Sequence, residues 1–119
     1  MRFLWSFARS NPGQRMVGWV FQNMSAVLPV KRLYETPTLL AFYHPKPVYP
    51  VHILLVPKKA IESPLHLGET DQDFLVDVFE AVRVLVGELA LAEKGYRLVL
   101  NGGAYQDMAQ LHFHLISGE

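Results

Sequence analysis

The sequence predicts an α+β domain in which a five-stranded antiparallel sheet packs against one long helix and an N-terminal helix. Two observations carry this prediction. Short apolar runs bounded by prolines, glycines and polar turn residues are typical of strands, whereas in two longer segments the apolar residues recur at helical spacing. The predicted elements follow one another in the order helix, hairpin, strand, long helix, strand and strand. This order is typical of an antiparallel sheet backed by a helix.

The first half of the chain is expected to supply one helix and three strands. Apolar residues at helical spacing predict an amphipathic helix over 14–27, which Pro29 ends. The runs 32–35 and 39–43 flank a Thr-Pro-Thr turn and predict a hairpin. Three prolines keep the next connection extended, and the apolar run 52–56 predicts a third strand. These prolines are Pro45, Pro47 and Pro50.

The second half is expected to supply the long helix and the last two strands. Thr70 as N-cap and Gly95 as C′ residue bound a helix over 71–94. Its apolar stripe is wider than one sheet face can cover, which predicts a second burial surface such as another subunit. The runs 97–100 and 109–116 predict the fourth and fifth strands. The stripe consists of Phe74, Val78, Val82, Leu85 and Leu89, flanked by Val76, Phe79, Val84, Val86 and Leu91.

The composition predicts one domain, 14–119, preceded by a basic and aromatic extension, 1–13. Half of the 119 residues are hydrophobic, which is enough for a single compact core. The 11 basic and 11 acidic residues cancel, so the net charge does not predict binding to nucleic acid. The first 34 residues hold five basic and no acidic side chains, which leaves contact of this head with a membrane surface as an alternative.

The absence of cysteine excludes a disulfide framework, a thiolate zinc site and a cysteine nucleophile. The apolar stretch 16–30 has only 15 residues and contains Gln22 and Asn23, so it is too short and too polar to span a membrane. The turn sequence 11–13 interrupts any signal peptide. A cytoplasmic location is therefore expected.

The last predicted strand carries the residues on which a functional prediction rests. Alternation along a strand places Gln110, His112 and His114 on one face, with the two imidazoles about 7 Å apart along the strand. The preceding loop, 101–107, has two adjacent glycines together with amide and carboxylate side chains, and such loops offer backbone donors to phosphate oxygens. The loop and the strand together predict an anion site.

A neutral imidazole can attack phosphorus and leave again, because its ordinary pKa is near 6.5. His112 is accordingly expected to attack an α-phosphate and to form a nucleotidyl-histidine that water hydrolyses. Two alternatives stay open. The histidines could be ordinary core or surface residues, or half of a zinc site completed by two other side chains. Nothing in the spacing of the candidates selects a tetrahedral set from His44, His52, His66 and Asp107.

Several blocks of the chain, in order and spacing, resemble the histidine triad (HIT) superfamily of nucleotide hydrolases and transferases. The family signature is His-φ-His-φ-His-φ-φ, with φ apolar, and the final block 110–116 matches it except at its first position. The resemblance extends over residues 14–118. The other matching blocks are Leu28–Glu35, Leu40–Phe42, Pro50–Lys59 and Gly95–Asn101.

The resemblance implies a homodimer with a sheet continuous across the pair, long helices at the interface, and no cofactor or metal. It makes His112 the nucleophile, His114 the third triad member and His52 a supporting histidine. It also implies two sets of binding residues. The phosphate contacts are Asn101, Gln106 and Asp107, and the base pocket includes Phe42 and Leu54.

Two departures from the family pattern bear on activity. Gln110 occupies the position of the first triad histidine, and glutamine can form hydrogen bonds but cannot titrate. His44 occupies a position where relatives place an acid that holds the ribose hydroxyls. The sequence therefore predicts a nucleotide hydrolase or nucleotidyl transferase acting on a phosphoramidate, a dinucleotide or a similar substrate. The alternative is a catalytically weak nucleotide-binding or scaffold protein.

Overall fold

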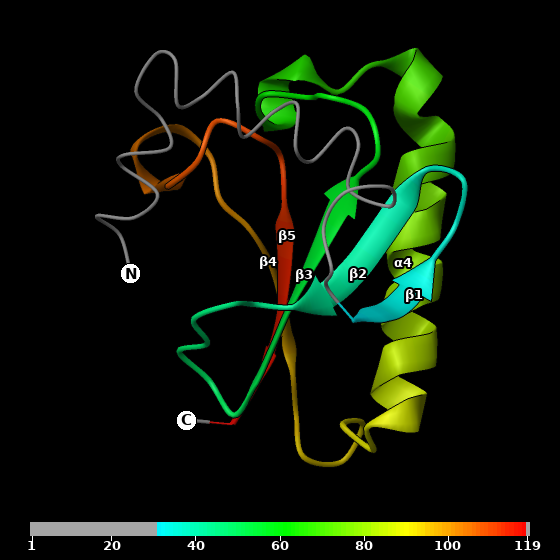
Figure 1. The fold of residues 1–119 in the computed structure, drawn as a ribbon, viewed down its shortest axis with the longest axis vertical. Coiled ribbons are helices and arrows are strands. Elements are labelled where there is room, and N and C mark those ends of the chain that lie inside the picture. The colour runs from blue at the N-terminus through cyan, green and yellow to red at the C-terminus, as the bar shows by residue number, and fades with distance from the viewer. Residues whose placement is uncertain (1–30, 119) are drawn as a thin grey trace.

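The computed structural model describes residues 31–118, which form a five-stranded antiparallel sheet with one long helix against one face (Figure 1). The strand order is β1-β2-β3-β5-β4, so the last strand in sequence lies inside the sheet. The predicted helix 14–27 and the extension 1–13 lie outside the described residues. The strands are β1 (Arg32–Glu35), β2 (Leu39–Tyr43), β3 (Val51–Pro57), β4 (Arg97–Leu100) and β5 (Phe113–Ser117).

The predicted hairpin, third strand and fourth strand are confirmed. The turn between β1 and β2 is held to the helix by one carboxylate. Asp77 accepts hydrogen bonds from the hydroxyls of Thr36, at 2.8 Å, and Thr38, at 2.6 Å. The Thr36 hydroxyl also accepts from the backbone N–H groups of Thr38 and Leu39, so this turn has both local and tertiary hydrogen bonds.

The long helix α4 (Gln72–Glu88) is shorter than the predicted 71–94, and the assignment of Gly95 as its C′ residue is wrong. Ala90, with φ of 55°, adopts the left-handed conformation instead, and the N–H of Leu91 donates to the Val86 carbonyl. This is a Schellman ending. It turns the chain so that Leu91, only 1% exposed, enters the core, which a helix continuing to residue 94 would not allow.

The start of α4 also differs from the expected Thr70 cap. Thr70 lies in the short 3-10 helix η2 (Glu69–Asp71), and Asp71 occupies the N-cap position without a side-chain capping bond. The Asp71 carboxylate instead accepts from the Gly68 N–H at 2.9 Å and pairs with the Lys59 ammonium at 2.6 Å. A second 3-10 helix, η1 (Pro64–His66), precedes it in the same loop.

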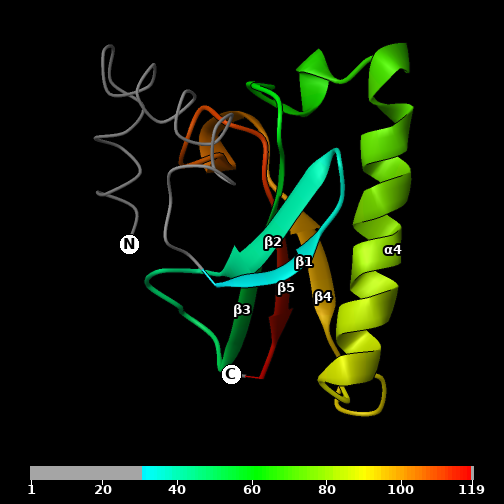
Figure 2. The same ribbon diagram turned by 45° about the vertical axis from the view of Figure 1, so that its right-hand side comes forward.

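The two faces of the sheet are chemically different. Figure 2 shows α4 lying along one face, where the predicted stripe residues Phe74, Val78, Val82 and Leu85 are buried. The strands contribute alternate aliphatic and aromatic side chains to this core: Leu39, Ala41, Ile53, Leu55, Phe113 and Leu115. The intervening strand positions, which include Phe42, His52, Leu54 and His114, belong to the opposite face.

Two of the apolar residues that flank the predicted stripe are exposed on the outer side of α4. Val76 is 67% exposed and Phe79 is 64% exposed, one helical turn apart. No helix within residues 31–118 has the length and apolar character needed to cross a membrane.

The fifth strand begins later than the predicted 109–116. It starts at Phe113 because the preceding residues have another partner: the Leu111 N–H donates to the Ile61 carbonyl at 2.7 Å. Gln110 and His112 therefore precede the strand, and only His114 lies within it. The loop 101–107 contains a short 3-10 helix, η3 (Gly103–Tyr105).

Candidate functional site

Two imidazoles from neighbouring inner strands meet on the face of the sheet opposite α4. The antiparallel register pairs Leu54 with His114 and His52 with Ile116, so His52 and His114 are diagonal neighbours. Their rings are within reach of each other, and His52 Nε2 lies 3.0 Å from His114 Nδ1. The geometry joins β3 and β5 through a side-chain hydrogen bond as well as through the backbone ladder.

The loop between β2 and β3 fixes the tautomers of two histidines. The backbone N–H of Lys46 donates to His44 Nδ1 at 3.0 Å, and that of Val48 donates to His52 Nδ1 at 3.1 Å. A ring nitrogen that accepts a hydrogen bond carries no proton. The proton of each neutral imidazole therefore resides on Nε2.

The tautomer of His52 determines that of His114. Because His52 carries its proton on Nε2, that group donates to His114 Nδ1. His114 must then hold its own proton on Nε2. One backbone N–H thus orients two imidazoles in series, and the neutral His114 offers a donor at its far nitrogen.

His112 has the opposite tautomer. Its Nδ1 lies 2.7 Å from the backbone carbonyl oxygen of Gln110, which can only accept, so the proton is on Nδ1 and the lone pair is on Nε2. The His112 and His114 ring centroids are 4.9 Å apart with the planes at 66°. The ring centroids are thus closer than the spacing of about 7 Å expected along a strand, and His112 lies before β5 begins.

Burial holds all four imidazoles in the neutral form at neutral pH. It lowers the pKa of His44 to about 4 and that of His114 to about 3, and like charges on neighbouring histidines lower both further. Burial also lowers the pKa of His52 and of His112. For His112 the Gln110 carbonyl and the Asp107 carboxylate act in the opposite direction without overcoming burial.

A cavity of about 330 Å³ opens beside this cluster. It brings together five of the residues predicted for the site, from β3, β5 and two loops. These are His44, His52, Asn101, Asp107 and His114. The remaining lining residues are Val48, Tyr49, Val99 and Ile116.

The other predicted site residues do not line this cavity. Gln106 donates through Nε2 to the carbonyls of Glu62 and Met108, at 2.6 and 2.8 Å, and so ties the 101–107 loop to another segment. Gln110 is 1% exposed, and its Nε2 donates to the Lys59 carbonyl at 3.4 Å. Phe42 and Leu54 are buried and lie in one row across the sheet with His114.

Several groups that contact the imidazoles were not predicted from the sequence. Tyr49 contacts His52 edge-on with centroids 5.5 Å apart, and the loop 44–50 supplies the two backbone donors described above. The three prolines of this loop predict its extended course. They do not by themselves indicate which imidazoles it contacts, because a backbone donor is present at every residue except proline.

The possible zinc ligands do not assemble into a set. Within residues 31–118 no group of three or more histidine, aspartate or glutamate side chains is arranged to hold a metal ion. His66 lies apart from the cluster, where its Nδ1 and the Ser63 hydroxyl are 2.7 Å apart.

Comparisons with known proteins place this geometry in a family. Residues 25–119 match the HIT domain. A HIT-like protein of Synechococcus elongatus is 36% identical over 93 residues, which cover 76% of this chain and 81% of that protein. A HIT-like protein of Rickettsia prowazekii is 33% identical over 95 residues, covering 77% and 79%.

Solved structures agree with this family match. A HIT family hydrolase from Clostridium thermocellum has a TM-score of 0.76 at 33% identity, covering 85% of this chain and 90% of that one. A histidine triad nucleotide-binding protein from Candida albicans has a TM-score of 0.72 at 26% identity, covering 85% and 75%. The chain belongs to the HIT domain family.

Proposed function

We propose that this protein is a hydrolase or nucleotidyl transferase that acts at the α-phosphate of a nucleotide derivative through a covalent nucleotidyl-His112. The observation that carries the proposal is the tautomer of His112. The Gln110 carbonyl holds the proton on Nδ1, which leaves the Nε2 lone pair as the nucleophile. The lowered pKa of His112 keeps that lone pair unprotonated at neutral pH.

The reaction of a nucleoside phosphoramidate would proceed in two displacements. His112 Nε2 forms a bond to phosphorus while the bond from phosphorus to the leaving nitrogen breaks, and that nitrogen takes a proton from the His52–His114 pair. Water then attacks the same phosphorus, the bond to His112 breaks, and a proton from water returns to the pair. The products are an amine and a nucleoside monophosphate.

In this proposal the loop 101–107 contacts the phosphate. Asn101 and Asp107 line the same cavity as His114 and His52, and Gln106 holds their loop in place through its two carbonyl contacts. The buried row of Phe42 and Leu54 on the same face of the sheet would contact the nucleobase, and His44 occupies the position at which the resemblance places the ribose hydroxyls. These assignments follow the family resemblance.

We further propose that Gln110 replaces the first histidine of the triad. Its amide is buried and donates to the Lys59 carbonyl, so it supports the segment that precedes His112 without titrating. Nucleotide binding is then expected to survive this replacement better than turnover does.

Assembly into a homodimer would cover the exposed apolar residues of α4. Val76 and Phe79 lie one turn apart on the outer side of the helix, and β4 is an edge strand with unpaired backbone groups on its outer side. Light scattering on the wild type is expected to give twice the mass of the chain, and Phe79→Glu is expected to give the monomer. A monomeric wild type would contradict the dimer.

The proposed activity is tested with a fluorogenic adenosine phosphoramidate. We expect release of the fluorophore by the wild type, and a loss of about 10³-fold or more in His112→Ala. Acid quenching during turnover is expected to trap a nucleotidyl adduct on His112. Measurable AMP binding without turnover would instead identify a nucleotide-binding or scaffold protein, and absence of binding by any nucleotide would exclude both functions.

The contribution of residue 110 is tested by Gln110→His. A higher turnover rate in this variant would assign the rate deficit to the first triad position. An unchanged rate, with AMP affinity also unchanged, would show that glutamine serves this site as well as histidine.

A further inference from the structure

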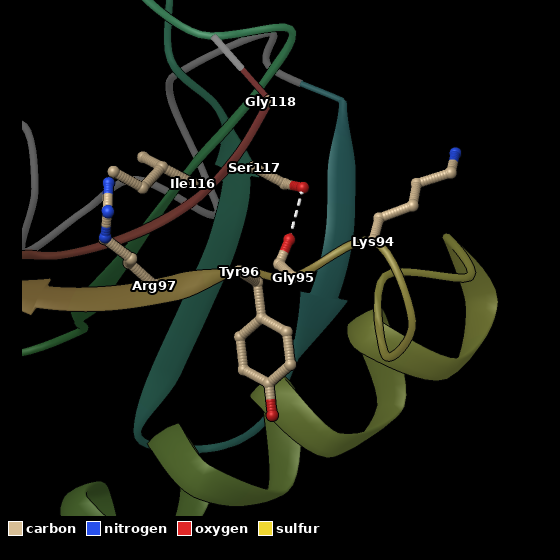
Figure 3. A pocket seen from close by; sticks show the side chains of 7 residues that line it. All are labelled: Lys94, Gly95, Tyr96, Arg97, Ile116, Ser117 and Gly118. Carbon is tan, nitrogen blue, oxygen red and sulfur yellow. Dashed lines mark hydrogen bonds between the residues drawn. The ribbon is translucent and has the colours of Figure 1, made fainter.

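A second cavity, of about 340 Å³, lies where β4 begins and β5 ends. Figure 3 shows its lining, which comes from the turn before β4 (Lys94–Arg97) and from the end of β5 (Ile116–Gly118). Ile116 lines both cavities. A ligand held at the histidines could therefore extend past Ile116 into this second space.

The strand register places Arg97 two residues along β4 from Val99, the partner of His114. Val99 pairs with His114 and Arg97 pairs with Ile116, so Arg97 and Val99 share the face that carries His114. Two residues along a strand correspond to about 7 Å. Figure 3 shows the Arg97 side chain beside Ile116, whereas the Lys94 side chain extends away from the cavity.

The two cavities differ in charge. The histidine cavity is lined by neutral imidazoles and by one carboxylate, Asp107. The second cavity is lined by Lys94 and Arg97, and no carboxylate among residues 31–118 belongs to its lining. None of the ion pairs among the described residues involves Arg97. Its guanidinium therefore has the capacity to pair with an anion from outside the chain.

The floor of the second cavity is fixed by hydrogen bonding and close packing. The Ser117 hydroxyl donates to the Gly95 carbonyl at 2.6 Å, and this bond joins the two segments that line the space. Gly118, with φ of 83°, packs so closely on Pro50 that a Cβ would lie 2.8 Å from the proline Cγ. These two contacts hold the end of β5 against the turn before β4 and against Pro50.

We propose that this cavity binds an acidic leaving group, with Arg97 pairing with its carboxylate while His112 attacks the phosphorus. The inference rests on the proposed function and adds a substrate class to it. The preferred substrates are phosphoramidates of amines that carry a carboxylate a few carbon atoms from the nitrogen. After the phosphorus–nitrogen bond breaks, the leaving nitrogen takes its proton from the His52–His114 pair, and the amino acid departs with its carboxylate unchanged.

The test compares two substrates that differ by one charge. These are the adenosine 5′-phosphoramidates of 4-aminobutanoate and of 4-aminobutanamide, which have the same chain length. We expect the wild type to turn over the carboxylate with a kcat/KM about 3- to 10-fold higher, mainly through KM, as befits a partly exposed ion pair. Arg97→Gln is expected to remove this preference and to leave kcat/KM for the amide substrate nearly unchanged.

Two control variants separate the site from a general charge effect. Arg83 is exposed on α4, pairs with Glu80 and does not line the cavity, so Arg83→Gln removes the same charge outside the site and is expected to retain the preference. Lys94→Gln is expected to retain most of it, since that side chain extends away. Equal kcat/KM for the two substrates in the wild type, or a preference that persists in Arg97→Gln, would overturn the inference.

Failure of the inference and failure of the proposed function give different results. Turnover of both substrates without a preference leaves the function in place and removes the acidic subsite. Absence of turnover removes the function, and the subsite is then decided by calorimetric binding of the two compounds to the wild type and to Arg97→Gln. Light scattering on Arg97→Gln completes the test, because loss of assembly with equal effects on both substrates would also overturn the subsite.

Discussion

β5 presents Phe113 and Leu115 to the core beneath α4, whereas His114, between them, belongs to the opposite face with His52. The core face is held by apolar burial, which tolerates small shifts of its side chains. The histidine face depends on hydrogen bonds near 3 Å whose direction matters. Successive residues of one strand thus belong to the core and to the histidine face, and changes at neighbouring positions should have different effects on stability and on the proposed activity.

The largest contrast is expected between Leu115→Ala and His114→Asn. Leu115 is fully buried, and its truncation should lower the free energy of unfolding by about 2–5 kcal/mol. His114→Asn keeps an acceptor near the Nδ1 position, so stability should change by less than about 1.5 kcal/mol. Turnover by this variant should nevertheless fall about 10²- to 10⁴-fold. Urea denaturation and phosphoramidate kinetics measure the two effects, and similar stability losses in both variants would contradict the division of the faces.

Lowering the pH should reduce the free energy of unfolding through the buried histidines of this face. Folding holds the pKa of His44 at about 4 and that of His114 at about 3, below the ordinary 6.5, so the unfolded chain binds more protons in this range. Stability is therefore complete above about pH 6.5 and falls as the pH approaches 4, by about 1.4 kcal/mol per pH unit for each extra proton bound on unfolding.

Urea titrations at several pH values measure this slope. His114→Asn should reduce it, and His66→Gln, which alters an exposed histidine outside the cluster, is the matched control. An equal slope in wild type and His114→Asn would contradict the prediction.

Gly118→Ala should affect both stability and the imidazole network. The substitution strains a left-handed backbone and brings its Cβ against Pro50, so we expect a loss of about 1–3 kcal/mol. Displacement of the 44–50 loop should also lengthen the bond from the Val48 N–H to His52, which nitrogen-15 NMR of the imidazoles detects. Gly87→Ala, in an open position on α4, is the matched control and should stabilise the helix slightly.

The smallest effect is expected at the carboxylate that joins the hairpin to the helix. Asp77→Asn retains one acceptor for the two threonine hydroxyls and should cost about 1 kcal/mol of stability. Phosphoramidate turnover should remain at the wild-type level, because the contact lies on the side of the sheet that faces α4. A fall in kcat without a fall in stability would show that the two faces are coupled.

Sequence patterns predicted the elements whose residues interact locally. The β1–β2 hairpin has its turn residues and its strand residues in one stretch of chain, and β4 is a compact apolar run. The end of α4 could not be found in this way, since residues 89–92 alternate leucine and alanine and both favour helix. The helix ends at Glu88 because Leu91 is buried in the core, and that is a tertiary interaction.

Sequence reasoning named candidate-site residues where the side-chain type itself indicates chemistry. His52, His112 and His114 were named in this way, and their rings lie close together in the structure despite the late start of β5. The second cavity and the donors to His44 and His52 were not found. The second cavity depends on the contact of the 44–50 loop with the end of β5, which is a tertiary interaction. The donors are backbone N–H groups, whose partners cannot be inferred from the type of residue that carries them.

The prolines of the 44–50 loop determine which backbone groups can serve the imidazoles. Pro45 and Pro47 have no N–H, and the residues between and after them, Lys46 and Val48, supply the two donors. Most side chains at 46 and 48 would preserve the imidazole tautomers, whereas a proline at either position would remove a donor. A one-residue deletion that moved Pro47 to position 46 would have the same result. Most substitutions in the 44–50 loop should thus leave the imidazole tautomers unchanged, whereas a change in the length of the loop should alter them.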